Sequence, residues 1–197
     1  KLAAAYRTGN GVPPDPARSF ALFAELAAAT GNGNALQRLG DFYARGIGVA
    51  TDTPRAIDYY KQAIAAGSTY ANISLGRALM TIGEGEAALA AFTQARDAGR
   101  DSAVLEIALG HASGGFGAAS DPELGIPVLA ELAKAGNDKA KYSLAEAYRK
   151  GVGTAPDPAR SIALFEDLAE TDNSNALLRL GDFYANGVGV PTDLQKA

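Results

Sequence analysis

Histidine and the carboxylates are the residues of this chain whose types could support acid-base or metal chemistry. The 197 residues include one histidine, His111, and no cysteine. A multi-histidine metal site and a cysteine nucleophile are therefore excluded, and a Ser-His-Asp arrangement would have to use this single ring. Because His111 stands where related segments carry tyrosine, we interpret it as a structural, partly buried side chain. We expect no catalytic residue, no metal and no cofactor.

Carboxylate pairs and glycine-rich stretches could support two further kinds of chemistry. Glu84 and Glu86 lie in expected solvated turns, where nothing distinguishes an acid from a base. The stretches 46–48 and 114–117 have neither the preceding strand nor the following Lys-Ser or Lys-Thr of a phosphate loop. Turn geometry explains them better. A hydrolase site assembled across repeats stays open as an alternative, which loss of turnover in a His111 or Glu146 variant would reveal.

A repeated pair of residues reveals the elements that position these side chains. Leucine followed by glycine, or a close substitute, recurs at spacings of 36, 32, 37 and 36 residues. The pairs are Leu39-Gly40, Leu75-Gly76, Ile107-Ala108, Leu144-Ala145 and Leu180-Gly181. A fixed period of this size predicts stacked structural repeats, each too small to bury its apolar face alone.

The repeat boundaries follow from this spacing. We predict one continuous array of residues 1–197, with truncated repeats at 1–31 and 174–197 and full ones at 34–67, 70–99, 101–136 and 138–171; the repeat 70–99 has a shortened turn. A longer period is also present, because 6–28 resembles 148–170 and 34–49 resembles 175–190. We expect the chain to be a fragment of a longer protein that ends inside a helix and has lost its targeting signal.

Each repeat is expected to contain two helices. Leu36, Leu39 and Tyr43 have the spacing of one apolar helix face. Glycines such as Gly46 should end the first helices in a left-handed conformation. Asp-Pro pairs such as Asp157-Pro158 should begin the second helices, with the Asp accepting free backbone N–H groups.

The amino-acid composition of the chain restricts the kinds of partner that it can bind. Hydrophobic residues make up 47% of the chain, Trp is absent, and the formal net charge is −4 without long runs of one sign. This balance provides no basic surface for a nucleic-acid backbone, so we expect no nucleic-acid partner. No apolar run reaches the roughly 18 residues of a membrane span.

The repeats resemble the Sel-1-like family, relatives of the tetratricopeptide repeat with a longer internal turn. The resemblance rests on Leu39, Gly40, Tyr43, Gly46 and Tyr60 with their counterparts, and on 180–190. It implies an all-α, right-handed α-solenoid whose first helices line a concave face. It also implies a non-catalytic protein-interaction scaffold, in the periplasm or cell envelope of a bacterium, in exopolysaccharide (alginate-like) secretion or envelope signalling. Alternatives are a cytoplasmic protein and a module attached to a polysaccharide-modifying enzyme.

Candidate binding residues follow from the tetratricopeptide geometry that the resemblance implies. Concave positions then fall two and five residues on either side of the repeated leucine. The predicted protein-binding residues are Asn34, Gln37, Asp41, Tyr70, Arg77, Lys139, Tyr142, Glu146, Arg149, Asn175 and Asp182. Tyrosine and arginine contribute strongly at protein interfaces. The oligomeric state is not predicted.

Overall fold

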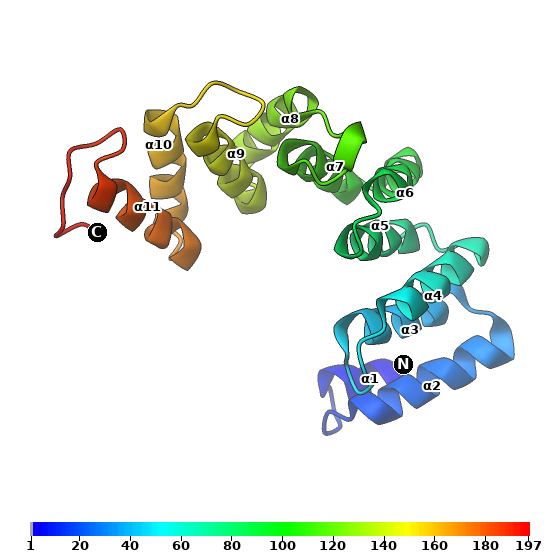
Figure 1. Ribbon diagram of the computed structural model, residues 1–197. Helices are drawn as coiled ribbons and strands as arrows, with labels where there is room; N and C mark the ends of the chain where they lie inside the picture. The colour runs from blue at the N-terminus through cyan, green and yellow to red at the C-terminus, as the bar shows by residue number, and fades with distance from the viewer. Residues whose placement is uncertain (1) are drawn as a thin grey trace. The chain divides into compact units, whose positions relative to one another are not determined.

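The computed structural model describes residues 2–197, which form eleven α-helices and one short 3-10 helix with no β-strand among them (Figure 1). The all-α repeat of helix pairs predicted from the sequence is confirmed. The chain divides into two compact units, one ending at Ala103 and one spanning Val104–Ala197. The right-handed superhelix and the single continuous array stay predictions.

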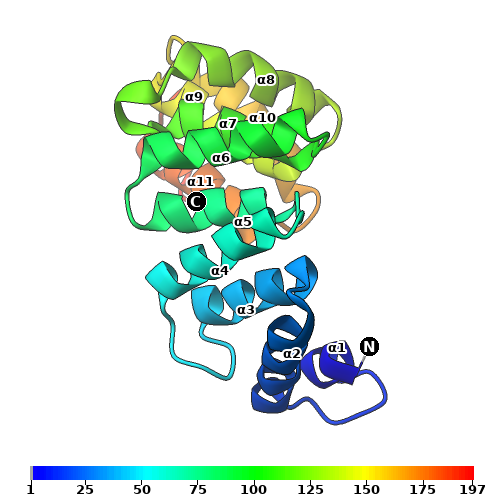
Figure 2. The ribbon, with the colours of Figure 1, turned by 90° about the vertical axis from the view of Figure 1, so that its right-hand side faces the viewer.

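The first unit consists of helix pairs joined by turns (Figures 1 and 2). α1 packs against α2, α3 against α4, and α5 against α6, while α2 also contacts α3 and α4 contacts α5. The bounds are α1 Leu2–Thr8, α2 Pro16–Thr30, α3 Gly33–Arg45, α4 Thr53–Ala65, α5 Ala71–Thr81 and α6 Gly85–Asp97.

The second unit continues the same alternation. α9 packs against both α8 and α10, and α10 packs against α11. The bounds are α7 Ser102–Ser113, which begins at the boundary between the units, the 3-10 helix η1 Gly117–Ala119, α8 Pro122–Lys134, α9 Asp138–Lys150, α10 Pro158–Ala169 and α11 Ser174–Asn186.

Aspartate caps begin the second helices as the sequence predicts. The carboxylates of Asp15, Asp52 and Asp157 each accept the backbone N–H three residues further on, at 2.9, 2.9 and 3.0 Å. Asp121 accepts the N–H of Glu123 at 3.1 Å. These bonds satisfy donors that a helix leaves unpaired at its start. They fix where α2, α4, α10 and α8 begin.

A close approach between the two helices of a repeat explains the glycine of the Leu-Gly pair. A Cβ added at Gly40 would lie 2.5 Å from the Tyr60 ring. Tyr60 is 3% exposed, and its neighbours Leu39 and Ala63 are also buried. The repeat 34–67 therefore stacks α4 directly on the backbone of α3, which an added methyl would prevent without rearrangement.

The chain after α11 forms one turn that Asp193 caps. Residues 194–196 form this turn where the sequence predicts the start of a helix. The Asp193 side chain accepts the backbone N–H groups of Gln195 at 3.0 Å and Lys196 at 3.3 Å. The Ala197 N–H lies 3.2 Å from the Asp193 carbonyl oxygen, at the i to i+4 spacing of a helical turn. The helix expected there stays a prediction.

Candidate functional site

An ionic cluster on α9 and α11 brings together the largest group of predicted binding residues. The Glu146 carboxylate lies 2.8 Å from Arg149 Nη2, 2.9 Å from Lys150 Nζ and 3.0 Å from Arg179 Nε. Arg179 also pairs with Asp182 at 3.2 Å. The Glu146 side chain is 14% exposed, whereas Arg149 and Arg179 are about one third exposed and Lys150 is 55% exposed. A largely covered carboxylate thus holds three accessible cations.

Helix geometry assembles this cluster. Arg149 and Lys150 follow Glu146 by three and four residues, so the three side chains share one face of α9. The Asn137 side chain caps the start of α9, and Gly151 ends it in a left-handed conformation with φ 71°. α11 is the first helix of the next repeat, and α10 packs against both first helices. The cluster therefore joins the first helices of neighbouring repeats.

The charge state of the cluster is set at Glu146. Burial alone would raise the pKa of this carboxyl, but hydrogen bonds and charge from Arg149 and Lys150 outweigh it and lower the pKa to about 2. Hydrogen bonds to Tyr142 and Asp182 raise the pKa of the Arg179 guanidinium. The Glu146 carboxylate and the Arg149 and Arg179 guanidinium groups are therefore charged at neutral pH.

Tyr142 borders the cluster on α9. Its half-buried ring meets the Phe165 ring edge to face, with centroids 5.4 Å apart. Lys139 lies one turn earlier, 61% exposed, with Nζ 3.7 Å from the Glu106 carboxylate. Asn175 is exposed in the first turn of α11. These side chains add a ring, a cation and an amide near the ionic cluster.

Two of the predicted residues of α3, Gln37 and Asp41, are engaged in contacts within the first unit. The Gln37 side chain accepts from Ser68 Oγ at 3.1 Å and donates to Ser74 Oγ at 3.5 Å. Asp41 accepts from the Tyr60 hydroxyl at 3.0 Å and pairs with Arg38 at 2.9 Å. Burial and the Asp41 charge raise the pKa of Tyr60. Gln37 and Asp41 thus connect helices.

Three further predicted residues of the first unit are exposed. Asn34 lies in the first turn of α3, Arg77 lies on α5, and Tyr70 precedes α5 at its N-cap position. Tyr70 is 56% exposed, and the Arg100 guanidinium lies over its ring at 3.9 Å. Arg100 also donates to Thr69 Oγ1 at 2.7 Å. Tyr70 therefore presents a ring with one face covered by a cation.

Two members of the ionic cluster, Lys150 and Arg179, were not predicted from the sequence. Lys150 follows Glu146 by four residues, the spacing of a helical ion pair, and this signal was available in the sequence. Arg179 directly precedes the repeated leucine, Leu180, a position that the transferred geometry did not mark. Its contact with Glu146 depends on how neighbouring first helices approach each other, which one sequence does not state.

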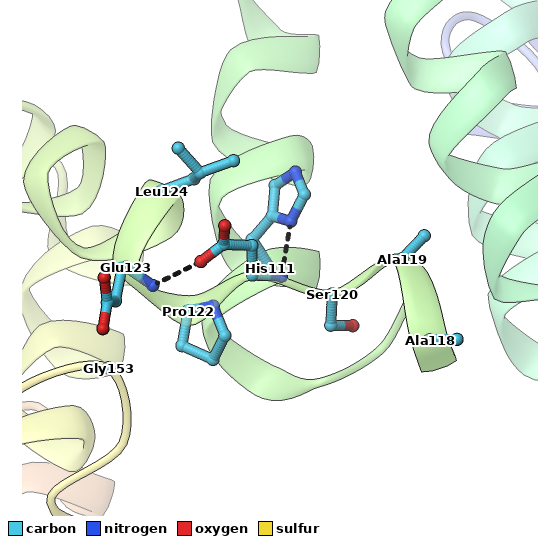
Figure 3. A pocket seen from close by; sticks show the side chains of 9 residues that line it. His111, Ala118, Ala119, Ser120, Pro122, Glu123, Leu124 and Gly153 are labelled. Carbon is cyan, nitrogen blue, oxygen red and sulfur yellow. Dashed lines mark hydrogen bonds between the residues drawn. The ribbon is translucent and has the colours of Figure 1, made fainter.

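His111 is buried at 9% exposure, where the sequence predicted a structural, partly buried histidine. The Asp121 backbone N–H donates to His111 Nδ1 at 3.0 Å, and Figure 3 marks this bond with a dashed line at the imidazole ring. Phe116 meets the imidazole edge to face at 5.1 Å. The open hollow beside the ring is lined by residues 118–121 of the segment between α7 and α8, by residues 122–124 at the start of α8, and by Gly153. His111 thus connects α7 to the turn that precedes α8.

No group of three or more His, Asp or Glu residues within 2–197 is arranged to hold a metal ion. None of the helices in that range combines the length and hydrophobicity needed to cross a bilayer. In the second unit, the charged side chains of the first helices are concentrated in the ionic cluster on α9 and α11. These side chains can recognise a partner through charge and hydrogen bonds.

Paired helices with aspartate caps at the second helix and left-handed glycines after the first define a helical-repeat protein. The Sel1 repeat model matches residues 1–30, 33–68, 138–170 and 174–197, which is more than half of the chain. The chain therefore belongs to the Sel1 repeat family. The repeats 70–99 and 101–136 lie between the matched segments.

Solved structures show the same relationship. A Sel1 repeat protein from Oxalobacter formigenes is 28% identical over the whole of this chain and 81% of its own length, with a TM-score of 0.70. A protective antigen of uropathogenic Escherichia coli strains, which displays an SLR fold, is 26% identical over 99% of this chain with a TM-score of 0.67. This chain spans 42% of that antigen. A search of curated protein sequences gave no match.

Proteins built from Sel1 repeats are generally scaffolds that bind other proteins, and the family is generally non-catalytic. The family relationship therefore favours protein recognition over catalysis as the role of the ionic cluster and its neighbours.

Proposed function

We propose that this chain is a non-catalytic scaffold that binds an acidic segment of a partner protein through the first helices of its second unit. The observation that carries the proposal is the ionic cluster, in which Glu146 holds Arg149, Lys150 and Arg179 in place. A preformed set of cations loses little side-chain entropy when a partner binds. Family membership supports a protein as the partner.

The N–H donors of the cluster that do not contact Glu146 determine which chemical groups of a partner it can bind. Arg149 donates Nε and Nη2 to Glu146 at 3.1 and 2.8 Å, which leaves further N–H groups of its five free for another acceptor. Lys150 has three donors and contacts Glu146 with one face of its ammonium group. A partner carboxylate could accept from both, and an adjacent apolar side chain could contact the Tyr142 ring.

Quantitative affinity purification tests this proposal. The wild-type chain is compared with a Tyr142→Ala/Arg149→Ala variant and with Arg7→Ala, which alters the matching arginine of the near-duplicate segment 6–28. We expect the double variant to lose the captured partner while its helical circular dichroism is unchanged. The Arg7→Ala control should capture as wild type does. Undiminished capture by the double variant would refute the binding surface.

The setting of this scaffold is a further part of the proposal. We place it in a complex of the bacterial cell envelope, such as exopolysaccharide secretion machinery, and the support for this is the sequence resemblance described above. Fractionation of cells that express the full-length protein would test it. Recovery in the periplasm or membrane fraction agrees with the proposal, and recovery in the cytosol contradicts it.

A further inference from the structure

A second surface of the second unit is an apolar groove formed by α8, α9 and α10. Its volume is about 570 Å³, and its apolar lining comes from Ala133, Leu144, Ala163 and Leu164 together with the Tyr148 ring. The Arg160 guanidinium lies 5.5 Å from the centroid of that ring. The groove involves the second helices α8 and α10, and none of the cluster residues lines it.

Comparison with the repeat 34–67 shows why this groove is open. There Tyr59 stacks on Tyr43 with ring centroids 5.7 Å apart and planes 9° from parallel. Tyr148 is the counterpart of Tyr43, but Leu164 takes the place of Tyr59. The repeat 138–171 thus retains one ring of the pair and lacks the second. A ring supplied from outside could restore the contact.

Charge at the groove is also specific to this repeat. Lys141 replaces Leu36, which is buried in the repeat 34–67. The Lys141 side chain is 19% exposed and its Nζ is 2.6 Å from the Asp167 carboxylate. Lys134 and Arg160 line the groove too. Their partner carboxylates, Glu131 at 2.7 Å and Asp157 at 3.2 Å, lie outside the lining in exposed ion pairs, which contribute little. The lining itself carries three cations and one carboxylate, which favours an occupant with negative charge.

We propose that this groove binds a partner segment in which an aromatic side chain is flanked by carboxylates. The aromatic ring of the partner stacks on Tyr148, as Tyr59 stacks on Tyr43 in the repeat 34–67. The flanking carboxylates pair with Lys134, Lys141 and Arg160. The groove is a second recognition site, independent of the ionic cluster formed around Glu146.

A tryptophan peptide provides a direct probe, because the chain contains no Trp and the emission comes from the peptide alone. The anisotropy of the acetylated, amidated peptide Ala-Glu-Trp-Glu-Ala is titrated with protein. Two variants alter the groove. Leu164→Tyr fills it with a tyrosine ring, because Tyr59 stands at the matching position of the repeat 34–67. Ala163→Asp introduces a carboxylate, because Asp58 stands at the matching position of that repeat. Arg7→Ala, in the first unit, is the control, Lys150→Gln measures any share of the binding that the ionic cluster contributes, and circular dichroism checks the fold of each variant.

We expect saturable binding that both groove variants weaken at least fivefold and Arg7→Ala changes less than twofold. The peptide Ala-Lys-Trp-Lys-Ala should bind at least fivefold more weakly than the acidic one. The proposal fails if the acidic peptide does not bind, if both peptides bind equally, or if Ala163→Asp, an exposed position that should fold normally, binds as wild type does. A change of solution mass in Leu164→Tyr by light scattering would instead identify the groove as a self-association surface and contradict the peptide occupant.

Discussion

The segments 6–28 and 148–170 nearly repeat each other, and they share two contacts between their helices. The Arg18 guanidinium lies 4.8 Å from the Tyr6 ring centroid, and Arg160 lies 5.5 Å from that of Tyr148. Both copies also contain a buried serine that donates to a first-helix carbonyl, at 2.7 Å in one and 2.8 Å in the other. The contacts that hold a repeat together are therefore duplicated with it.

The surfaces of the two copies differ. Position 146 of the second copy carries glutamate where the first has Ala4, and position 150 carries lysine where the first has Thr8. Only the copy around α9 can therefore form the ionic cluster. Duplication thus preserved the scaffold, while substitutions at a few first-helix positions made one copy different. It also supplies matched controls for every test.

Truncation of an aromatic core residue should have the largest effect and should differ between the copies. Phe165 is fully buried, whereas its counterpart Phe23 is half-buried. We expect Phe165→Ala to lower the free energy of unfolding by roughly 3–5 kcal/mol, and Phe23→Ala to lower it by less, because less area is lost from the core. Urea unfolding of each variant measures this. Equal losses would mean that the two cores are equally packed.

Removal of the buried serine hydroxyl should have a smaller effect, equal in both copies. Ser19 donates to the Ala3 carbonyl and Ser161 to that of Ala145, and both serines are fully buried. Each serine-to-alanine change should lower the free energy of unfolding by about 1 kcal/mol. Urea midpoints of the two variants provide the comparison. A cost in one copy only would show that the duplicated bond does not stabilise both.

Acid should remove a stabilising effect that only the second copy has. The folded pKa of Glu146, about 2, is below the value of about 4.3 for an unfolded chain. The contribution is therefore present above pH 4.3 and is lost as the pH falls through 2. Solvent screening limits it to roughly 1 kcal/mol.

Unfolding of Glu146→Gln at pH 6 and at pH 2.5 measures this effect. The variant should be less stable than wild type at pH 6, and most of the difference should disappear at pH 2.5. Ala4→Gln, at the matching position of the first copy, should show no such dependence. A stability difference that persists unchanged at pH 2.5 would contradict the assignment of the charge to this cluster.

Much of the fold could be predicted because it depends on local signals. Asp157 caps α10 and Gly151 ends α9 for reasons that lie within a few residues of each. The Asp193 cap signal likewise lies at the start of a turn, residues 194–196. Local chemistry thus predicted where helices start and stop.

The candidate site was less accessible to prediction because it depends on contacts between helices. Gln37 and Asp41 were marked as binding residues from their register alone, yet both hold neighbouring helices through hydrogen bonds. Arg179 was not marked, although it completes the cluster around Glu146. The position of a residue relative to the repeated leucine predicts on which face of its helix the side chain lies. The partners of that side chain depend on how helices that are distant in sequence approach each other.

Calorimetric titration of the captured partner against three forms of the chain tests the central claim most directly. The forms are wild type, Arg149→Ala and the matched Arg7→Ala of the first copy. If the cluster on α9 and α11 is the binding surface, Arg149→Ala should raise the dissociation constant at least tenfold, and Arg7→Ala should leave it within twofold. An unchanged constant in Arg149→Ala, or an equal rise in both variants, would contradict the account.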